Sequence, residues 1–97
     1  MAVITVRQAL NEAFKEEMKI DPTIIMMGCD IGVRGGPFGI TLDLMNLYGK
    51  DRVIDTPISE PAFVGAGVGA AATGLRPVIE VLYSDWITLG MDQLVNM

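Results

Sequence analysis

The pattern of apolar and polar positions along the chain predicts helices and strands in alternation. Between residues 5 and 20, apolar side chains recur every three or four residues, and charged side chains occupy the opposite face. The run 23–28 is continuously apolar and has the length of a strand, which is typical of a strand buried on both faces. The runs 52–55 and 76–83, "RVID" and "RPVIEVLY", predict two further strands.

Local signals predict where the helices begin and end. Thr5, followed three residues later by Gln8, is a capping-box pattern that starts the first helix. A short amphipathic helix is predicted over 41–48. A third helix begins at Ser59 or Glu60, because Pro61 suits a first helical turn, and ends at Gly74. A fourth helix is predicted from about residue 85 towards the C-terminus.

The predicted order of elements is helix, strand, helix, strand, helix, strand, helix. Alternation of this kind favours the α/β class, with a parallel sheet, helices on both faces and right-handed crossovers. Only three strands are predicted, and the last helix shows no sequence signal for its end. We therefore expect residues 1–97 to form the first part of a larger domain, as three strands of a larger sheet.

Composition and charge exclude several classes of function. The net charge is −5, and no cluster of basic residues would attract nucleic acid or an anionic membrane. The chain has one cysteine and no histidine, so it lacks the usual zinc ligands and the base of a Ser-His-Asp site. We expect no metal site, no internal disulfide, no signal peptide and a cytoplasmic location.

Glu60 is the first candidate for chemistry, because it follows a predicted strand and opens an otherwise apolar helix. Open parallel sheets bind their ligands at the carboxyl ends of the strands, and we expect Glu60 to lie there, after a central strand. Position and residue type also fit a simple alternative, an exposed acid in the first turn of a helix. Both interpretations remain open from the residues alone.

The glycine-rich segment "GAGVGAA", residues 65–71, allows two interpretations. Its spacing loosely matches a dinucleotide-binding fingerprint, but that fingerprint places the first glycine directly after a strand. Gly65 instead falls well inside the predicted helix, where Gly65 and Gly69 share one face of small residues. We expect this face to pack closely against another helix or subunit rather than to bind a phosphate.

Three further residues after or within the strands are candidates for the same region. Trp86 follows the third strand and is either a core residue or an apolar wall for a ring-shaped ligand. Glu80 lies within the predicted third strand and needs a partner if it is buried. We expect Cys29, beside Asp30, to be a small buried filler, since no neighbouring base marks it as a nucleophile.

Several motifs together resemble one family over almost the whole chain. They are "GCDIGVRGGPFGIT", "RVIDTPISEPAFVGAGVGAAATGLRPVIE" and "MDQLVN". The family is the beta subunit of the thiamine-diphosphate-dependent decarboxylase components of pyruvate, branched-chain 2-oxo acid and acetoin dehydrogenases. The resemblance implies a transketolase-like pyrimidine-binding domain, of which this chain is the N-terminal portion.

The resemblance also implies roles for individual residues. Glu60 matches the family glutamate that hydrogen-bonds N1′ of the cofactor's aminopyrimidine ring, which favours the tautomer whose 4′-nitrogen removes the thiazolium C2 proton. Ile58, Leu82 and Trp86 match positions that line the same ring. The helix from Gly65 to Gly69 matches a family segment implicated in packing between subunits. Cys29 is a departure, because the family usually has an acid there that helps to link distant sites.

Partners and cofactors follow from the resemblance as well. In the family, an alpha subunit completes a heterotetramer and holds the diphosphate and Mg²⁺, and a dihydrolipoyl acyltransferase core receives the acyl group on lipoamide. We therefore expect residues 1–97 alone to be inactive and, with an open sheet edge, to self-associate. Two other interpretations are a transketolase-type thiamine diphosphate enzyme and a non-catalytic assembly module.

Overall fold

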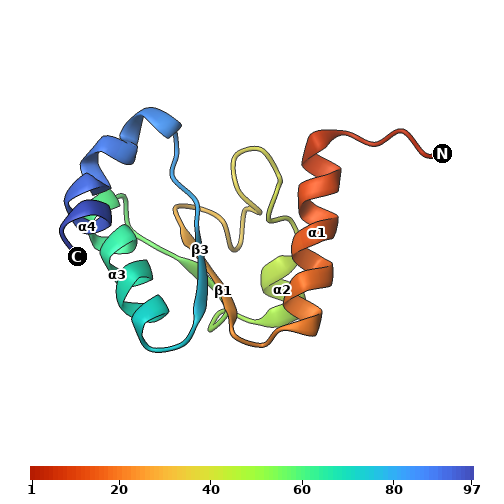
Figure 1. The fold of residues 1–97 in the computed structure, drawn as a ribbon. Coiled ribbons are helices and arrows are strands. Elements are labelled where there is room, and N and C mark those ends of the chain that lie inside the picture. The colour runs from red at the N-terminus through yellow and green to blue at the C-terminus, as the bar shows by residue number, and fades with distance from the viewer.

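The computed structural model describes all residues, 1–97, and its helices and strands alternate as the sequence pattern predicts (Figure 1). Two helices and two strands make up the first half of the chain, and a third helix, a third strand and two short helical segments complete it. In chain order these elements are α1 (Val6–Ile20), β1 (Ile24–Gly28), α2 (Leu44–Tyr48), β2 (Val53–Asp55), α3 (Glu60–Ala72), β3 (Arg76–Ile79), the 3₁₀ helix η1 (Ser84–Gly90) and α4 (Met91–Val95).

The three strands form one parallel sheet in the order β2-β1-β3. Gly28 at the end of β1 pairs with Asp55 at the end of β2, and Met27 pairs with Ile79 at the end of β3. The carboxyl ends of all three strands therefore meet at one edge of the sheet. The fold class predicted from sequence, a parallel α/β sheet, is confirmed.

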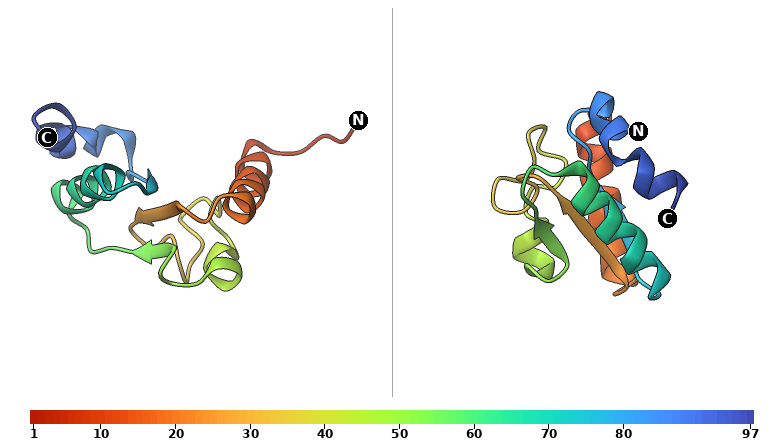
Figure 2. Two further views of the ribbon diagram at one scale, coloured as in Figure 1. Left: turned by 60° about the horizontal axis from the view of Figure 1, so that its bottom comes forward. Right: turned by 90° about the vertical axis from the view of Figure 1, so that its left-hand side faces the viewer.

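Helices cover both faces of the sheet. Helices α1 and α2 lie on one side, and α3 lies on the other, as the two further views show (Figure 2). On the α1 side, six buried side chains form the core: Met18, Ile24, Met26, Ile31, Leu44 and Val53. All five residues of β1 are buried, which agrees with the prediction of a strand covered on both faces.

Local sequence signals explain the ends of the helices. The capping box at α1 is present, because Thr5 accepts a hydrogen bond from the backbone of Gln8, and the Gln8 side chain accepts one from the backbone of Thr5. Helix α3 begins at Glu60, with Pro61 in its first turn. Gly74, which follows the end of the helix, has a φ of +100°, a conformation that glycine adopts without strain.

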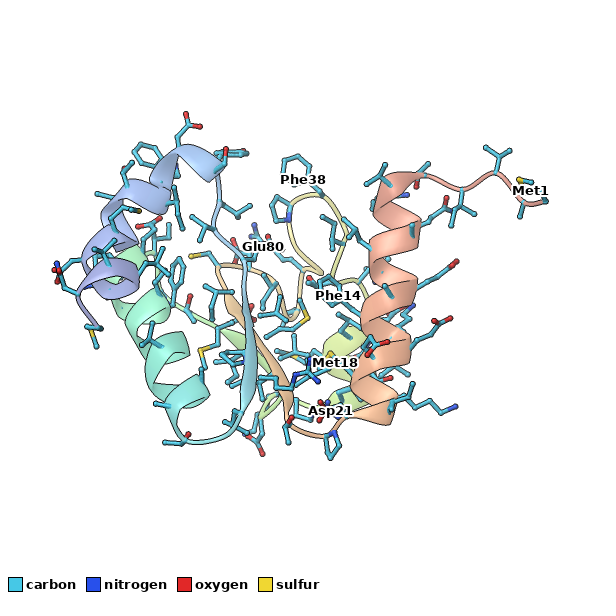
Figure 3. The ribbon with its side chains drawn as sticks, in the orientation of Figure 1. Met1, Phe14, Met18, Asp21, Phe38 and Glu80 are labelled. Atoms are coloured by element: carbon cyan, nitrogen blue, oxygen red, sulfur yellow. The ribbon has the colours of Figure 1, made fainter.

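Asp21 ends α1 and starts the turn into β1. Its carboxylate accepts hydrogen bonds from the hydroxyl and the backbone N–H of Thr23, and these bonds, with a smaller contribution from Arg76, lower the pKa of Asp21 below its ordinary value of 3.8. The figure with side chains shows Asp21 below Met18 at this end of α1 (Figure 3). The aspartate therefore fixes the direction in which the chain enters the sheet.

Four details of the predicted fold are wrong. Strand β2 lies at an edge of the three-stranded sheet and not at its centre, which β1 occupies. The third strand ends at Ile79 instead of extending to residue 83, and the predicted fourth helix is divided into η1 and α4. Helix α2 begins at Leu44, because residues 41–43 form turns.

None of the helices has both the length and the apolar character that are needed to cross a membrane.

Candidate functional site

A hollow of about 410 Å³ lies where the carboxyl ends of the three strands meet. Each strand contributes residues from the segment that follows it, so parallel pairing brings together positions that are far apart in sequence. We call this cavity the Glu60 hollow. Its lining residues are Cys29 and Asp30 after β1, Ile58 and Glu60 after β2, and Leu82, Trp86 and Leu89 after β3.

Glu60 is the most unusual residue of this hollow. The residue is only 7% exposed, yet none of the hydrogen bonds and ion pairs of the chain involves its carboxylate. As the first residue of α3 it lies in the positive field of the helix N-terminus, which stabilises a carboxylate by about 0.3–1 kcal/mol. The hollow thus contains a nearly buried acid whose hydrogen-bonding capacity is unused by the chain.

The other walls of the Glu60 hollow are mainly apolar. Ile58, Leu82, Trp86 and Leu89 line it, and Trp86 remains 49% exposed. The interpretation of Trp86 as a core residue is therefore wrong, because its indole lies at the edge of the cavity instead of inside the packed interior. Aromatic and aliphatic walls around one polar group suit a flat heterocycle with a single hydrogen-bonding edge.

The sequence-based candidates thus come together in space. Glu60, Ile58, Leu82 and Trp86 share one cavity, although the last two lie more than twenty residues beyond the first two. Asp30 and Leu89 also line the cavity and were missed by sequence reasoning. Parallel pairing of β1 with β3 was the signal that could have found them, because both follow strand ends at the same edge.

Asp55 is a further residue that sequence reasoning missed. Its carboxylate accepts a 2.7 Å hydrogen bond from the backbone N–H of Gly32 and a longer one from Val33, which ties the glycine-rich loop after β1 to the end of β2. A Cβ atom at Gly32 would overlap Cε of Met45 and lie 2.7 Å from Oδ2 of Asp55, so a side chain there would displace both neighbours. Asp55 thereby holds the loop that carries Cys29 and Asp30 beside Glu60.

Glu80 lies just beyond β3 and faces the same glycine-rich loop (Figure 3). Its Oε1 atom is fully enclosed and has no hydrogen-bond partner, and burial raises the pKa of this carboxyl above its ordinary value of 4.5. The chain therefore lacks the hydrogen-bond partner that a buried Glu80 was expected to have. An ideal Cβ at Gly36 would be 3.7 Å from Oε1, so the loop backbone closes over the acid.

Cys29 differs from its predicted role as a buried filler. The residue is only partly buried and lines the Glu60 hollow, and its thiol donates to the carbonyl oxygen of Pro57 at 3.4 Å. The prediction failed because β1 ends at Gly28, so the side chain of the next residue leaves the sheet core for the edge where the site lies.

The small-residue face of α3 is divided between two environments. Gly65 faces α4, since a Cβ there would lie 3.2 Å from Cγ of Gln93, while Gly69 has no heavy atom within 4 Å of the corresponding position. Helix α4 therefore already uses part of the face inside the chain. Packing of Gly65 and Gly69 against another subunit stays a prediction.

The chain contains no group of three or more His, Cys, Asp or Glu side chains arranged to hold a metal ion. The donor atoms of the Glu60 hollow are one unpaired carboxylate, the Asp30 carboxylate and one thiol. This set suits an organic ligand with a polar edge better than a directly bound cation, which requires several converging oxygen atoms.

Comparisons with known proteins agree with this architecture. The sequence model of the family "Transketolase, pyrimidine binding domain" matches residues 2–97. The chain is 49% identical over 96 residues to the pyruvate dehydrogenase E1 component subunit beta of Chlorokybus atmophyticus, covering 99% of this chain and 29% of that protein.

Two further relatives are beta subunits of pyruvate and 2-oxoisovalerate dehydrogenases. The mitochondrial pyruvate dehydrogenase E1 component subunit beta-1 of Oryza sativa subsp. japonica is 46% identical over 93 residues, which are 96% of this chain and 25% of that protein. The 2-oxoisovalerate dehydrogenase subunit beta of Bacillus subtilis is 40% identical over 96 residues, or 99% and 29%.

The chain thus spans about a quarter of the length of the curated relatives that it matches. Some of these relatives are named as mitochondrial or chloroplastic proteins, so a cytoplasmic location of this chain stays a prediction.

Proposed function

Because the chain belongs to the family of the transketolase pyrimidine-binding domain, we propose that it is the N-terminal portion of that domain in the beta subunit of a thiamine-diphosphate-dependent 2-oxo acid dehydrogenase. Identities of 40–49% to beta subunits that act in pyruvate and 2-oxoisovalerate dehydrogenases support this assignment. The substrate is then pyruvate, a branched-chain 2-oxo acid or acetoin. The remaining part of this domain and a C-terminal domain complete the subunit.

The observation that carries the proposal is the nearly buried residue Glu60, whose carboxylate is unpaired in a cavity with apolar walls. An aminopyrimidine ring is flat, apolar on its two faces and polar along its edge, so its chemistry fits these residues. Glu60 would hold a proton at ring atom N1′, while Ile58, Leu82 and Trp86 would contact the faces of the ring. Bound thiamine diphosphate supplies the electron sink for decarboxylation of the substrate.

The chain's own residues contribute in three ways. Glu60 orients the ring and shares a proton with it at one atom, which is acid–base work that typically contributes about 10²–10⁴-fold to a rate. The apolar walls exclude water from this hydrogen bond and so strengthen it. Asp55 fixes the loop after β1, which keeps the third side of the hollow in place.

The partners follow from the same assignment. An alpha subunit would complete a heterotetramer and bind the diphosphate with Mg²⁺, because the described chain offers no cluster of metal ligands near Glu60. A dihydrolipoyl acyltransferase core would accept the acyl group. Residues 1–97 alone would then bind at most the ring half of the cofactor and would catalyse no decarboxylation.

Reconstitution tests the proposal. The complete beta subunit is mixed with its alpha subunit, thiamine diphosphate, Mg²⁺ and a 2-oxo acid, and reduction of an artificial electron acceptor is followed. Glu60→Gln keeps the shape of the side chain but cannot share a proton in the same way, so we expect kcat to fall by about 100-fold or more.

The matched control is Glu17→Gln on the exposed face of α1, which removes one negative charge far from the hollow and should leave kcat unchanged. Undiminished decarboxylation by the Glu60→Gln enzyme would show that this glutamate has no catalytic role. Transfer of a two-carbon unit between sugar phosphates, in place of 2-oxo acid oxidation, would point to a transketolase-type enzyme.

A further inference from the structure

The thiol of Cys29 shares the Glu60 hollow and has no assigned role there. Cys29 is the only cysteine of the chain and directly follows β1. Its Sγ donates to the carbonyl oxygen of Pro57 at 3.4 Å and lies 3.9 Å from Oγ1 of Thr56. Because the residue is only partly buried and lines the cavity, a small reagent that enters the cavity reaches the sulfur.

A second and independent observation shows that the same cavity is built for a ligand. Glu60 is only 7% exposed as a residue and lines the cavity, and its carboxylate has no hydrogen-bond partner in the chain. With about 410 Å³ available, the hollow has room for one ring-sized ligand. A group attached to Sγ of Cys29 would therefore occupy space that a ligand of Glu60 also needs.

We propose that Cys29 is a site of reversible mixed-disulfide formation with low-molecular-weight disulfides, and that the attached group fills the Glu60 hollow and excludes its ligand. In the exchange, the Cys29 sulfur attacks one sulfur of the disulfide RS–SR as a thiolate, and a new S–S bond forms. The original S–S bond breaks, and the leaving thiolate takes up the proton that Cys29 lost. A reducing thiol reverses the step.

The local contacts favour this regulatory use of the residue. In the reduced chain the thiol contacts the backbone of Pro57, in the segment that leads into Glu60. Modification removes that hydrogen bond and places the new group beside Ile58 and Glu60. Only the identity of the excluded ligand, thiamine diphosphate, rests on the proposed function.

The chain provides an unusually specific readout, because its one tryptophan, Trp86, lines the same hollow as its one cysteine. The full chain is treated with bis(2-hydroxyethyl) disulfide, the adduct is quantified by mass spectrometry, and quenching of Trp86 fluorescence by acrylamide is measured before and after. We expect one adduct per chain, at least a twofold fall in the quenching constant, and full recovery with dithiothreitol.

Two variants serve as controls. Cys29→Ser should form no adduct and keep the untreated quenching constant. Val33→Cys in the Cys29→Ser background moves the thiol to an 86% exposed position of the same loop, outside the lining of the hollow. This variant should form the adduct without any change in the quenching of Trp86.

Two results would overturn the proposal: failure of the folded wild-type chain to form the adduct while the urea-unfolded chain does so, and an adduct that leaves Trp86 quenching unchanged. Failure of the proposed function gives a different result. In that case thiamine diphosphate does not bind the reconstituted, unmodified enzyme in calorimetry, whereas adduct formation and shielding of Trp86, measured without ligand, are unaffected.

Discussion

The two sides of the sheet differ in how well apolar side chains are buried and polar side chains are hydrogen-bonded. On the side of α1 and α2, six apolar residues form a closed core, and polar side chains bond to backbone carbonyls across it. On the side of α3, η1 and α4, apolar residues remain exposed, and an enclosed side-chain oxygen of Gln93 remains unpaired. The first side holds the fold together, and the second carries the binding surfaces.

Hydrogen bonds from side chains to backbone explain the closed side. Arg52 donates to the carbonyl oxygens of Asp21 and Ile24, and Tyr48 donates to that of Lys15. Asn11 on α1 donates to the carbonyl oxygens of Ile40 and Leu42. These bonds cross between elements that are distant in sequence, and so they join α1 and the loops to the sheet.

The open side shows the opposite pattern. Besides the Glu60 hollow, an apolar groove of about 320 Å³ runs between α3, β3 and α4, and large apolar side chains of η1 and α4 are exposed beside it. Gln93 on α4 keeps one enclosed oxygen without a partner. Unpaired polar atoms next to apolar surface are typical of places where a ligand or another chain binds.

The largest expected effect on stability comes from breaking the closed side at Arg52. Arg52→Ala removes the hydrogen bonds of the guanidinium to the carbonyl oxygens of Asp21 and Ile24 and its contact with the ring of Tyr48. We expect the free energy of unfolding to fall by about 2 kcal/mol, as measured by urea denaturation. Lys50→Ala, at an exposed neighbouring position, should change it by less than about 0.5 kcal/mol. Equal effects of the two substitutions would remove the distinction between the two sides.

Two glycines of α3 provide a comparison within one helix. A Cβ at Gly67 would meet Cδ1 and Cγ1 of Ile79 at 2.7 and 2.8 Å, so Gly67→Ala should destabilise the fold by about 1–2 kcal/mol. Gly69 has open space, so Gly69→Ala should stabilise the helix by up to about 1 kcal/mol. Thermal unfolding of both variants checks this. A stabilised Gly67→Ala chain would mean that α3 does not pack on β3 as described.

The smallest effect concerns Glu80 and depends on pH. The folded chain binds a proton at Glu80 more tightly than the unfolded chain does, so this group contributes stability that is present below pH 4.5 and lost as the pH rises through its raised pKa. Glu80→Gln removes the cost of burying a charged carboxylate and should raise the free energy of unfolding at neutral pH. We expect only about 0.5–1 kcal/mol, because water screens the exposed part of the carboxyl. Urea denaturation at pH 4.5 and 7.5 measures the difference. A variant less stable than the wild type at pH 7.5 would show that the carboxylate has a partner after all.

Local signals in the sequence were enough to predict most of the regular structure. Helix α1 follows from its capping box and helical spacing, and α3 follows from Pro61 and Gly74, because these features act within one or two turns. The grouping of Glu60 with Ile58, Leu82 and Trp86 was predictable only through resemblance to a family, since the three strands align these residues through pairing that no local pattern specifies.

The features that sequence reasoning missed depend on contacts between distant segments. The third strand is short because its neighbour β1 ends at Gly28, and the N–H of Glu80 makes the last ladder bond, to Met27. The role of Asp55 depends on the loop after β1 folding back over the sheet edge. Neither a strand's end nor a carboxylate's partner can be predicted without the register of the sheet.

The central claim is that Glu60 binds and activates the aminopyrimidine half of thiamine diphosphate. The most direct test is the rate of hydrogen–deuterium exchange at C2 of the cofactor, followed by NMR after rapid quenching, in the complex of complete beta and alpha subunits. We predict that Glu60→Gln slows this exchange by about 100-fold or more while the cofactor stays bound. An unchanged exchange rate with the cofactor bound would contradict it.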